Sequence, residues 1–207
     1  MLAHAVDPLG KLAGNPCEGI KRLYSGDRSE IIWTDADVEA LKRTCTPEIA
    51  HAVDLAIHTG LRQGDLLRLC WSHVGDDAIK ITTGKSKHRR EAIIPLYDAL
   101  RDVLASIPKR STTILTNSLG RPWGLGFGSC FVLAKAKAGL ADRNLHFHDL
   151  RGTAATRFYA ADLPKRVIAE ILAREEDHVE KIIRRYVDRT ARTKAVIRQL
   201  SDFFRTK

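Results

Sequence analysis

Hydrophobic and polar positions follow a helical period over the first part of the chain. The stretch WTDADVEAL predicts a helix from about residue 35 to 45, because Thr34 and Asp37 have the spacing of a capping box. A second helix is expected in TPEIAHAVDLAIHTG, where Thr46 caps the start, a proline takes the first turn and Gly60 ends the helix. The stretch RQGDLLRL predicts a short third helix.

The period changes to that of a strand in AIKITTGKSKHRREAIIPL. Two runs rich in β-branched residues, Ile79–Thr83 and Ala92–Ile94, flank a polar tip that contains Gly84, and this predicts an antiparallel hairpin. A solvated turn and a contact to a nucleic-acid backbone both fit such a tip. Five cations lie in or beside it with no acidic residue between them: Lys80, Lys85, Lys87, Arg89 and Arg90.

Helical spacing returns in LYDALRDVLASI, GLGFGSCFVLAKAKAGL and HDLRGTAATRFYAADL, while STTILT is a candidate for a short extended piece. Further helices are expected from Pro164 to about residue 172, over about 175–187 and over about 190–204. The expected fold class is mainly α with a small antiparallel β-sheet (α+β). Residues 30–207 are expected to form one domain, and residues 1–29, which are rich in glycine and proline, a connector.

The charge balance points to a polyanionic partner. Lys and Arg number 34 against 25 Asp and Glu, which gives a net charge of +9 and a pI near 9.6. Nucleic acid is the simplest such partner. No apolar run approaches the length of a membrane span and no signal peptide is recognisable, so we expect a soluble, cytosolic protein without a membrane partner. The cysteines lack a CxxC spacing and are expected to be reduced: Cys17, Cys45, Cys70 and Cys130.

Several classes of enzyme lack their motif in this chain. It has no GxxxxGK[ST] phosphate loop, no GxGxxG and no GxSxG elbow. His146 and His148 stand two residues apart, but no cysteine or carboxylate pattern completes a zinc site. We therefore expect no cofactor and no metal.

Two basic segments are candidates for an anion site. Arg62 follows the helix-ending Gly60, where a guanidinium could bind a phosphate; an ion pair with Asp65 three residues on is the alternative. His148 and Arg151 lie three residues apart at the expected start of a helix, the end that attracts anions. The alternative there is an ordinary helix start, with an aspartate as its cap.

Tyr186 has two interpretations. It completes an apolar helix face with Val179, Ile182 and Ile183 at positions i, i+3, i+4 and i+7, and periodicity alone makes it a core tyrosine. Two arginines directly precede it, which would suit a nucleophile that attacks a phosphate. The local pattern favours the core.

Four segments, in this order, resemble the catalytic domain of the tyrosine recombinases, the phage integrase family: TGLRQGDLLRL, TGKSKHRREAIIPL, HDLRGTAATRFY and IIRRYVDR. The resemblance covers roughly residues 30–190. It implies the fold of that catalytic domain and site-specific DNA recombination, for integration or excision. The reaction it implies is strand cleavage and rejoining through a 3′-phosphotyrosyl intermediate.

The resemblance also implies a role for each matching residue. Arg62 and Arg151 would bind the non-bridging oxygens of the scissile phosphate, His148 would assist proton transfer, Lys85 would protonate the leaving 5′-oxygen, and Tyr186 would be the nucleophile. The remaining hairpin cations are expected to contact DNA, and the first of them is an alternative to the catalytic lysine: Lys87, Arg89 and Arg90.

The chain departs from the family's pattern upstream of the tyrosine. Family members usually have Leu-Gly-His or Leu-Gly-Trp where this chain has Leu172, Ala173 and Arg174. A guanidinium does not deprotonate, so Arg174 could donate to a phosphate oxygen at a sixth catalytic position but could not act as a general acid or base. We expect altered or reduced cleavage. His178, four residues on, is not assigned that role.

Residues 1–29 are too few for the N-terminal helical domain that family members usually carry, so they are expected to be its remnant. Weak, salt-sensitive binding to duplex DNA would follow. The alternative function is a degenerate, non-catalytic DNA-binding remnant of an integrase. By family analogy we expect self-association on DNA as a synaptic tetramer in the cytoplasm of a bacterium or phage host. The segment after residue 190 would then either dock into a neighbouring protomer or pack on its own domain.

Overall fold

The computed structural model describes residues 8–20, 28, 31–84 and 90–186. Of residues 185 and 186 it describes the backbone alone. The first half contains α2 (Asp35–Thr44), α3 (Pro47–Thr59), α4 (Gln63–Leu67), the 3₁₀ turn η1 (Trp71–His73), β1 (Ala78–Thr82) and β2 (Glu91–Pro95). The second half contains α5 (Asp98–Ser106), α6 (Phe127–Lys137), the 3₁₀ turn η2 (Phe147–Asp149), α7 (Leu150–Ala160), α8 (Lys165–Ile171) and α9 (Glu176–Tyr186). The predicted fold class, mainly helical with a small antiparallel sheet, is confirmed.

The ends of the first helices follow from local chemistry. The Thr34 hydroxyl accepts a hydrogen bond from Asp37 N, and the Asp37 carboxylate accepts one from Thr34 N, which is the predicted capping box. Thr46 stands at the predicted N-cap of α3, although its side chain makes no capping hydrogen bond. Gly60 ends α3 with φ 62°, a left-handed conformation that glycine adopts at little cost.

The predicted hairpin is formed by β1 and β2, which pair antiparallel from Ala78 opposite Pro95 to Thr82 opposite Glu91. Alternate residues point into the core, as the period of two requires. Ile79 faces Ile94 across the strands on the buried side. The tip, residues 85–89, lies outside the described residues, and so does the helix expected over 190–204.

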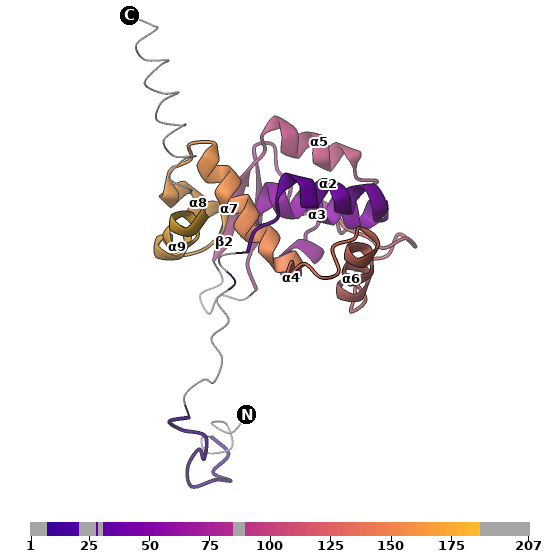
Figure 1. The fold of residues 1–207 in the computed structure, drawn as a ribbon. Helices are drawn as coiled ribbons and strands as arrows, with labels where there is room; N and C mark the ends of the chain where they lie inside the picture. Colours follow the sequence, from indigo (N-terminus) through magenta and orange to yellow (C-terminus); the bar gives the residue numbers. More distant parts are fainter. Residues whose placement is uncertain (1–7, 21–27, 29–30, 85–89, 187–207) are drawn as a thin grey trace, which may run out of the picture.

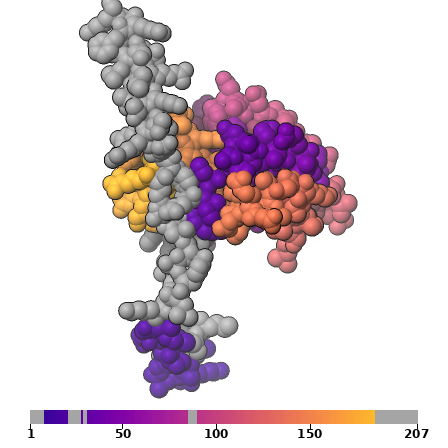
Figure 2. Space-filling model, viewed as in Figure 1, coloured from indigo at the N-terminus to yellow at the C-terminus, as the bar shows by residue number. Residues whose placement is uncertain are grey.

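Helix α7 runs through the middle of the molecule (Figure 1). It packs against α3 on one side and against α9 on the other, while α8 packs against both α9 and β2. Small residues suit the close packing of α7, and of Gly152, Thr153, Ala154 and Ala155 all but Gly152 are buried. Side chains of α2 and α6 meet on one face of the molecule (Figure 2). The centre of the fold thus joins the early helices to the late ones.

Trp33 fixes the entry of the chain into this body. Its backbone N–H donates to the Thr153 hydroxyl at 2.9 Å, and its indole N–H donates to the carbonyl oxygen of His146 at 3.0 Å. The ring is 2% exposed and packs edge-on against Phe131. Among residues 8–20 no helix or strand forms. No helix in the described ranges is long and apolar enough to cross a bilayer.

Candidate active site

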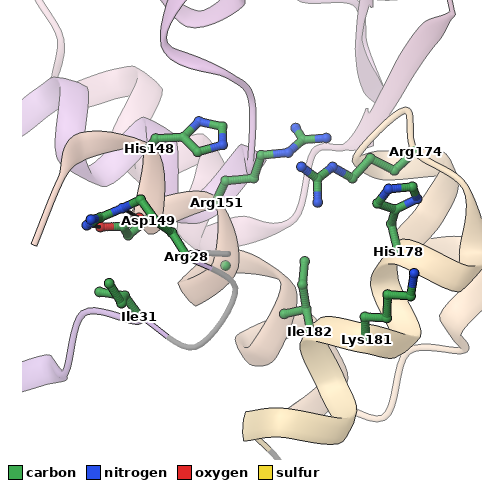
Figure 3. Close-up of a pocket in the computed structure, with 10 residues that line it drawn as sticks. Arg28, Ile31, His148, Asp149, Arg151, Arg174, His178, Lys181 and Ile182 are labelled. Atoms are coloured by element: carbon green, nitrogen blue, oxygen red, sulfur yellow. Dashed lines mark hydrogen bonds and ion pairs between the residues drawn. The ribbon is translucent and has the colours of Figure 1, made fainter. Parts of the chain in front are cut away.

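A cavity of about 430 Å³ opens between the start of α7, the α8–α9 turn and α9 (Figure 3). His148, Arg151 and Arg174 all project into it. The lining is dominated by cationic and imidazole groups, and its charged or titratable members are Arg28, His148, Asp149, Arg151, Arg174, His178 and Lys181. The cavity thus brings together residues from the predicted basic segment and from the turn upstream of Tyr186.

Arg151 is the most buried of these cations, with 3% of its surface exposed. Its Nη1 donates to the carbonyl oxygen of Gly60 at 2.5 Å, and its Nη2 donates to that of Leu172. It therefore connects α7 to the end of α3 and to the end of α8. Its Nε is buried without a hydrogen-bond partner among the described residues, which leaves a donor available for an anion.

Arg62 lies at the start of α4, two residues after Gly60. Its Nη1 is buried without a hydrogen-bond partner among the described residues and lies 4.0 Å from Asp65 Oδ2. The predicted alternative, a pair with Asp65, is therefore present only as a long contact. Asp65 makes its shorter contacts to Arg68 Nη2 at 2.7 Å and to Gly84 N at 2.9 Å.

Three guanidinium groups influence one another in this region. Burial, followed by the charges of Arg174 and Arg62, holds the pKa of Arg151 well below its ordinary value. Burial and the charge of Arg62 also lower the pKa of Arg174. Like charges held together in a partly buried site favour a bound anion, because the anion would relieve their repulsion. The arrangement suits a phosphate group.

His148 lies in η2, directly before α7, and its ring faces the cavity (Figure 3). Burial lowers its pKa, and the charges of Arg151 and Arg174 lower it further. The residue is exposed and lines the cavity. A neutral imidazole is favoured near neutral pH, and a neutral imidazole can accept a proton. In the described part of the chain no three His, Cys, Asp or Glu side chains gather where they could hold a metal ion.

Arg174 reaches the cavity from the turn between α8 and α9, where the chain departs from the family's usual residues. The turn is a Schellman motif: Ala173 N donates to Glu170 O at 3.0 Å, and Arg174 N donates to Ala169 O at 2.9 Å. Ala173 occupies its left-handed position with φ 44°. The left-handed position of such a turn favours glycine, the residue that the resemblance to the tyrosine recombinases implies there.

The base of the hairpin is attached to α4. Asp65 accepts the hydrogen bond from Gly84 N, and Arg68 Nη2 donates to the carbonyl oxygen of Thr82. Arg90, at the other side of the tip, pairs with Glu175 beside the α8–α9 turn. Because Glu175 already pairs with Arg90, the predicted contact of Arg90 with DNA would have to compete with this ion pair. The other predicted cations of the tip lie outside the described residues: Lys85, Lys87 and Arg89.

Tyr186 is the last residue of α9, and its side chain lies outside the described part of the structure. The helix face predicted with it is buried: Val179 is 0%, Ile182 5% and Ile183 3% exposed. The role of Tyr186, as core residue or as nucleophile, stays a prediction.

Sequence reasoning missed Arg28 and Lys181, which line the cavity, and named His178 without assigning it a role there. Arg28 belongs to the segment before α2 and has no regular spacing to the other site residues. His178 and Lys181 of α9 face the cavity together with Ile182 (Figure 3). His178 and Lys181 stand three residues apart on α9, the spacing of one helix face, and this was the available signal.

Comparison with known sequences identifies relatives. The chain is 29% identical to the shufflon-specific DNA recombinase of Escherichia coli, over 64% of this chain and 32% of that protein. It is 25% identical to a XerC-like tyrosine recombinase of Caldanaerobacter subterraneus subsp. tengcongensis, over 97% of this chain and 63% of that protein. The chain thus spans about one third of the length of the first relative and somewhat under two thirds of the length of the second.

Solved structures share the fold. A lambda integrase dimer bound to a COC′ core site superposes with a TM-score of 0.65 and 22% identity, over 87% of this chain and 55% of that one. The XerA recombinase superposes with a TM-score of 0.62 and 17% identity, over 82% of this chain and 65% of that one. The sequence model of the phage integrase family matches residues 33–192, well over half of the chain. This chain belongs to the phage integrase family.

Proposed function

We propose that this chain carries the active site of a site-specific tyrosine recombinase, which cleaves and rejoins duplex DNA for integration or excision. The observation that supports the proposal most directly is one cationic cavity lined by His148, Arg151 and Arg174, with Arg62 close enough for its charge to act on His148 and Arg151. The recombinases among its relatives make DNA the natural polyanion for this cavity.

The chemistry follows from the residues in their proposed roles. The Tyr186 hydroxyl attacks the phosphorus, and the bond between phosphorus and the 5′-oxygen breaks, which leaves a 3′-phosphotyrosyl link and a free 5′-hydroxyl. His148 assists removal of the phenolic proton, since tyrosine has a pKa of about 10 and is largely protonated at neutral pH. Lys85, or Lys87, supplies the proton that the 5′-oxygen takes. Rejoining reverses these steps and needs no ATP, because the phosphotyrosyl link conserves the energy of the phosphodiester bond.

The arginines stabilise the charge of the transition state. Arg62 and Arg151 each keep a buried N–H without a partner among the described residues, and these donors suit the non-bridging oxygens. Arg174 adds a third guanidinium in the sixth position. Because it cannot move a proton, it acts as a hydrogen-bond donor and a positive charge.

The proposed partners are duplex DNA and further copies of the chain. One structural relative is a lambda integrase tetramer bound to a Holliday junction. We propose that this chain also self-associates on DNA, in the cytoplasm of a bacterium or of a phage host. Hairpin cations such as Lys87, Arg89 and Arg90 would contact the DNA backbone, and Arg90 would do so in competition with Glu175.

The decisive experiment is covalent trapping. The full chain is incubated with a pool of nicked duplexes that have randomised centres, so that the cleaved strand escapes and the protein stays attached to DNA in denaturant. We expect a trapped complex with the unaltered chain and none with Tyr186→Phe. The matched control is Tyr159→Phe on α7, a tyrosine that packs against the core and does not line the cavity; it should be trapped normally.

The same experiment tests the alternative, a non-catalytic DNA-binding remnant. DNA binding by the unaltered chain without any trapping, together with no relaxation of a supercoiled plasmid, would favour that alternative. Equal trapping by Tyr186→Phe would contradict the proposed nucleophile.

A further inference from the structure

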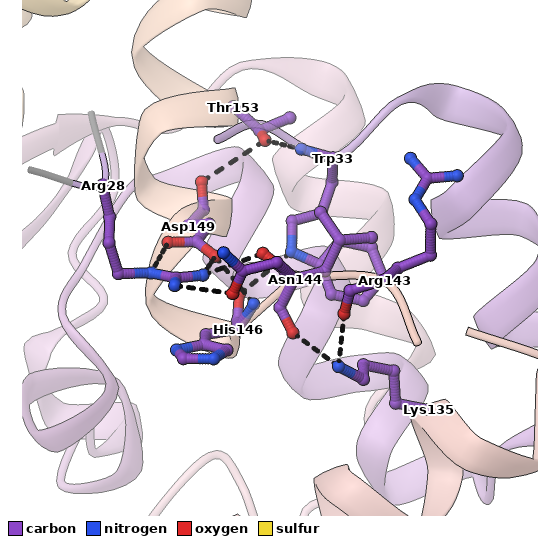
Figure 4. Close-up of polar contacts among 9 residues, drawn as sticks. Arg28, Trp33, Lys135, Arg143, Asn144, His146, Asp149 and Thr153 are labelled. Carbon is purple, nitrogen blue, oxygen red and sulfur yellow. Dashed lines mark hydrogen bonds and ion pairs between the residues drawn. The ribbon is translucent and has the colours of Figure 1, made fainter. Parts of the chain in front are cut away.

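Arg28 comes from the segment before α2 and reaches Asn144 and Asp149 (Figure 4). Its Nε and Nη2 donate to the two carboxylate oxygens of Asp149 at 3.2 and 2.7 Å. Its Nη1 donates to the side-chain oxygen of Asn144 at 2.8 Å, and Nη2 also donates to the Asn144 carbonyl oxygen at 2.9 Å. These contacts fix one guanidinium against a segment more than a hundred residues away in sequence.

Asp149 is the residue that makes this contact important for the cavity. Its side chain is 1% exposed, and its carboxylate also accepts a hydrogen bond from His146 N at 2.7 Å, which closes the η2 turn. His148 is held within that turn, and Arg151 follows in the first turn of α7. A buried carboxylate needs a positive partner, and Arg28 supplies it in bidentate form.

We infer that Arg28 is a positioning residue: by holding Asp149 it fixes the turn that presents His148, and it couples the segment before α2 to the cavity. Arg28 itself lines the cavity with 29% of its side chain exposed, so its ion pair with Asp149 forms part of the cavity wall. The effect on DNA cleavage rests on the proposed function. The effect on His148 rests on the contacts alone.

Removal of Arg28 would also change the charge around His148. Asp149 is the acidic group that acts on this imidazole, and Arg28 now neutralises it. Other cationic or titratable groups act on His148 or share its cavity. They come from the start of α4, from α7, and from the α8–α9 turn and α9: Arg62, Arg151, Arg174, His178 and Lys181. Without Arg28 the unbalanced carboxylate would favour the protonated imidazole.

The test compares Arg28→Met with the unaltered full-length chain in two measurements. The first is the titration of the His148 imidazole by nitrogen-15 NMR, with the resonance assigned from its loss in His148→Gln. The second is the single-turnover rate of DNA cleavage. In Arg28→Met we expect the His148 imidazole to titrate at higher pH. We also expect DNA cleavage to be slower by about tenfold or more, because a small misplacement of a catalytic group costs that much or more in rate.

Two further variants separate positioning from a general loss of stability. Arg28→Lys keeps the charge but lacks the planar fork, so it should keep the His148 titration near that of the unaltered chain and recover the rate only in part. Arg143→Met is the matched control, because Arg143 pairs at 3.2 Å with Asp37, a buried carboxylate that closes another helix start, and does not line the cavity. Its His148 titration and cleavage rate should match those of the unaltered chain.

Unchanged titration and rate in Arg28→Met would overturn the inference, and so would equal losses in Arg143→Met. If the unaltered chain does not cleave DNA, the proposed function fails, whereas the His148 titration still decides whether Arg28 balances the charge of Asp149 beside the imidazole.

Discussion

Arg151 donates a hydrogen bond to the carbonyl oxygen of Gly60, so a residue of the cavity holds the left-handed end of α3. A β-carbon at Gly60 would collide with the Leu172 side chain and lie 3.3 Å from Ala154 Cβ. Leu172 supplies the other carbonyl oxygen that Arg151 binds. Three segments that form the site therefore meet at a point where only glycine fits.

Gly60→Ala is expected to destabilise the protein by about 1–3 kcal/mol, because it adds backbone strain at positive φ to a steric clash. Urea denaturation measures this change. Gly64→Ala in α4 is the matched control: its β-carbon would meet no atom within 4 Å, and alanine favours the helix, so stability should hold or rise by up to about 1 kcal/mol. Equal effects of the two substitutions would contradict this account.

Ala173→Gly is expected to raise the free energy of unfolding by about 0.5–1 kcal/mol. Ala173 has φ 44° at the end of α8, where glycine avoids the strain of a β-carbon. Asp162→Gly should change stability in the same direction, since Asp162 has φ 61° at the end of α7. A loss of stability in both variants would show that the side chains contribute more than the backbone strain costs.

Inorganic phosphate is expected to raise the melting temperature more than chloride at equal ionic strength, since it would relieve the repulsion among Arg62, Arg151 and Arg174. Arg174→Gln should weaken this response. Arg166→Gln, which removes an arginine 83% exposed on α8, should leave the response intact. Differential scanning fluorimetry across a phosphate series measures it, and an equal response in all three proteins would contradict an anion site in the cavity.

Stability is expected to fall as the pH drops below about 6.5, the ordinary pKa of histidine. Burial lowers the pKa of His51, His58 and His148 in the folded protein. As the pH falls, these histidines therefore take up protons in the unfolded chain before they do so in the folded protein. Their contribution to stability is complete only above the pKa that they have in the unfolded chain. Urea unfolding at pH 7.5 and 5.5 measures the loss, which should be smaller in His58→Gln. Stability that rises on acidification across this range would refute the prediction.

Local pattern was sufficient for much of the fold. The Thr34–Asp37 capping box, the end of α3 at Gly60 and the β1–β2 hairpin could all be predicted, because caps, turns and strand alternation depend on residues close in sequence. The segment order also identified the family, since the four characteristic stretches lie in series along the chain. Thr46 stands at the expected N-cap of α3, without a side-chain capping hydrogen bond.

Only the tertiary structure decided which cations share one cavity. Periodicity left Arg62 as a surface arginine beside Asp65, whereas the fold leaves its Nη1 buried and within electrostatic reach of Arg151 and Arg174. The contact from Arg28 to Asp149 has no counterpart in sequence spacing, because 121 residues separate the two. The sequence by itself determined the local elements, whose energies come from neighbours along the chain. The site depends on distances between remote residues, and these are set by how the helices pack.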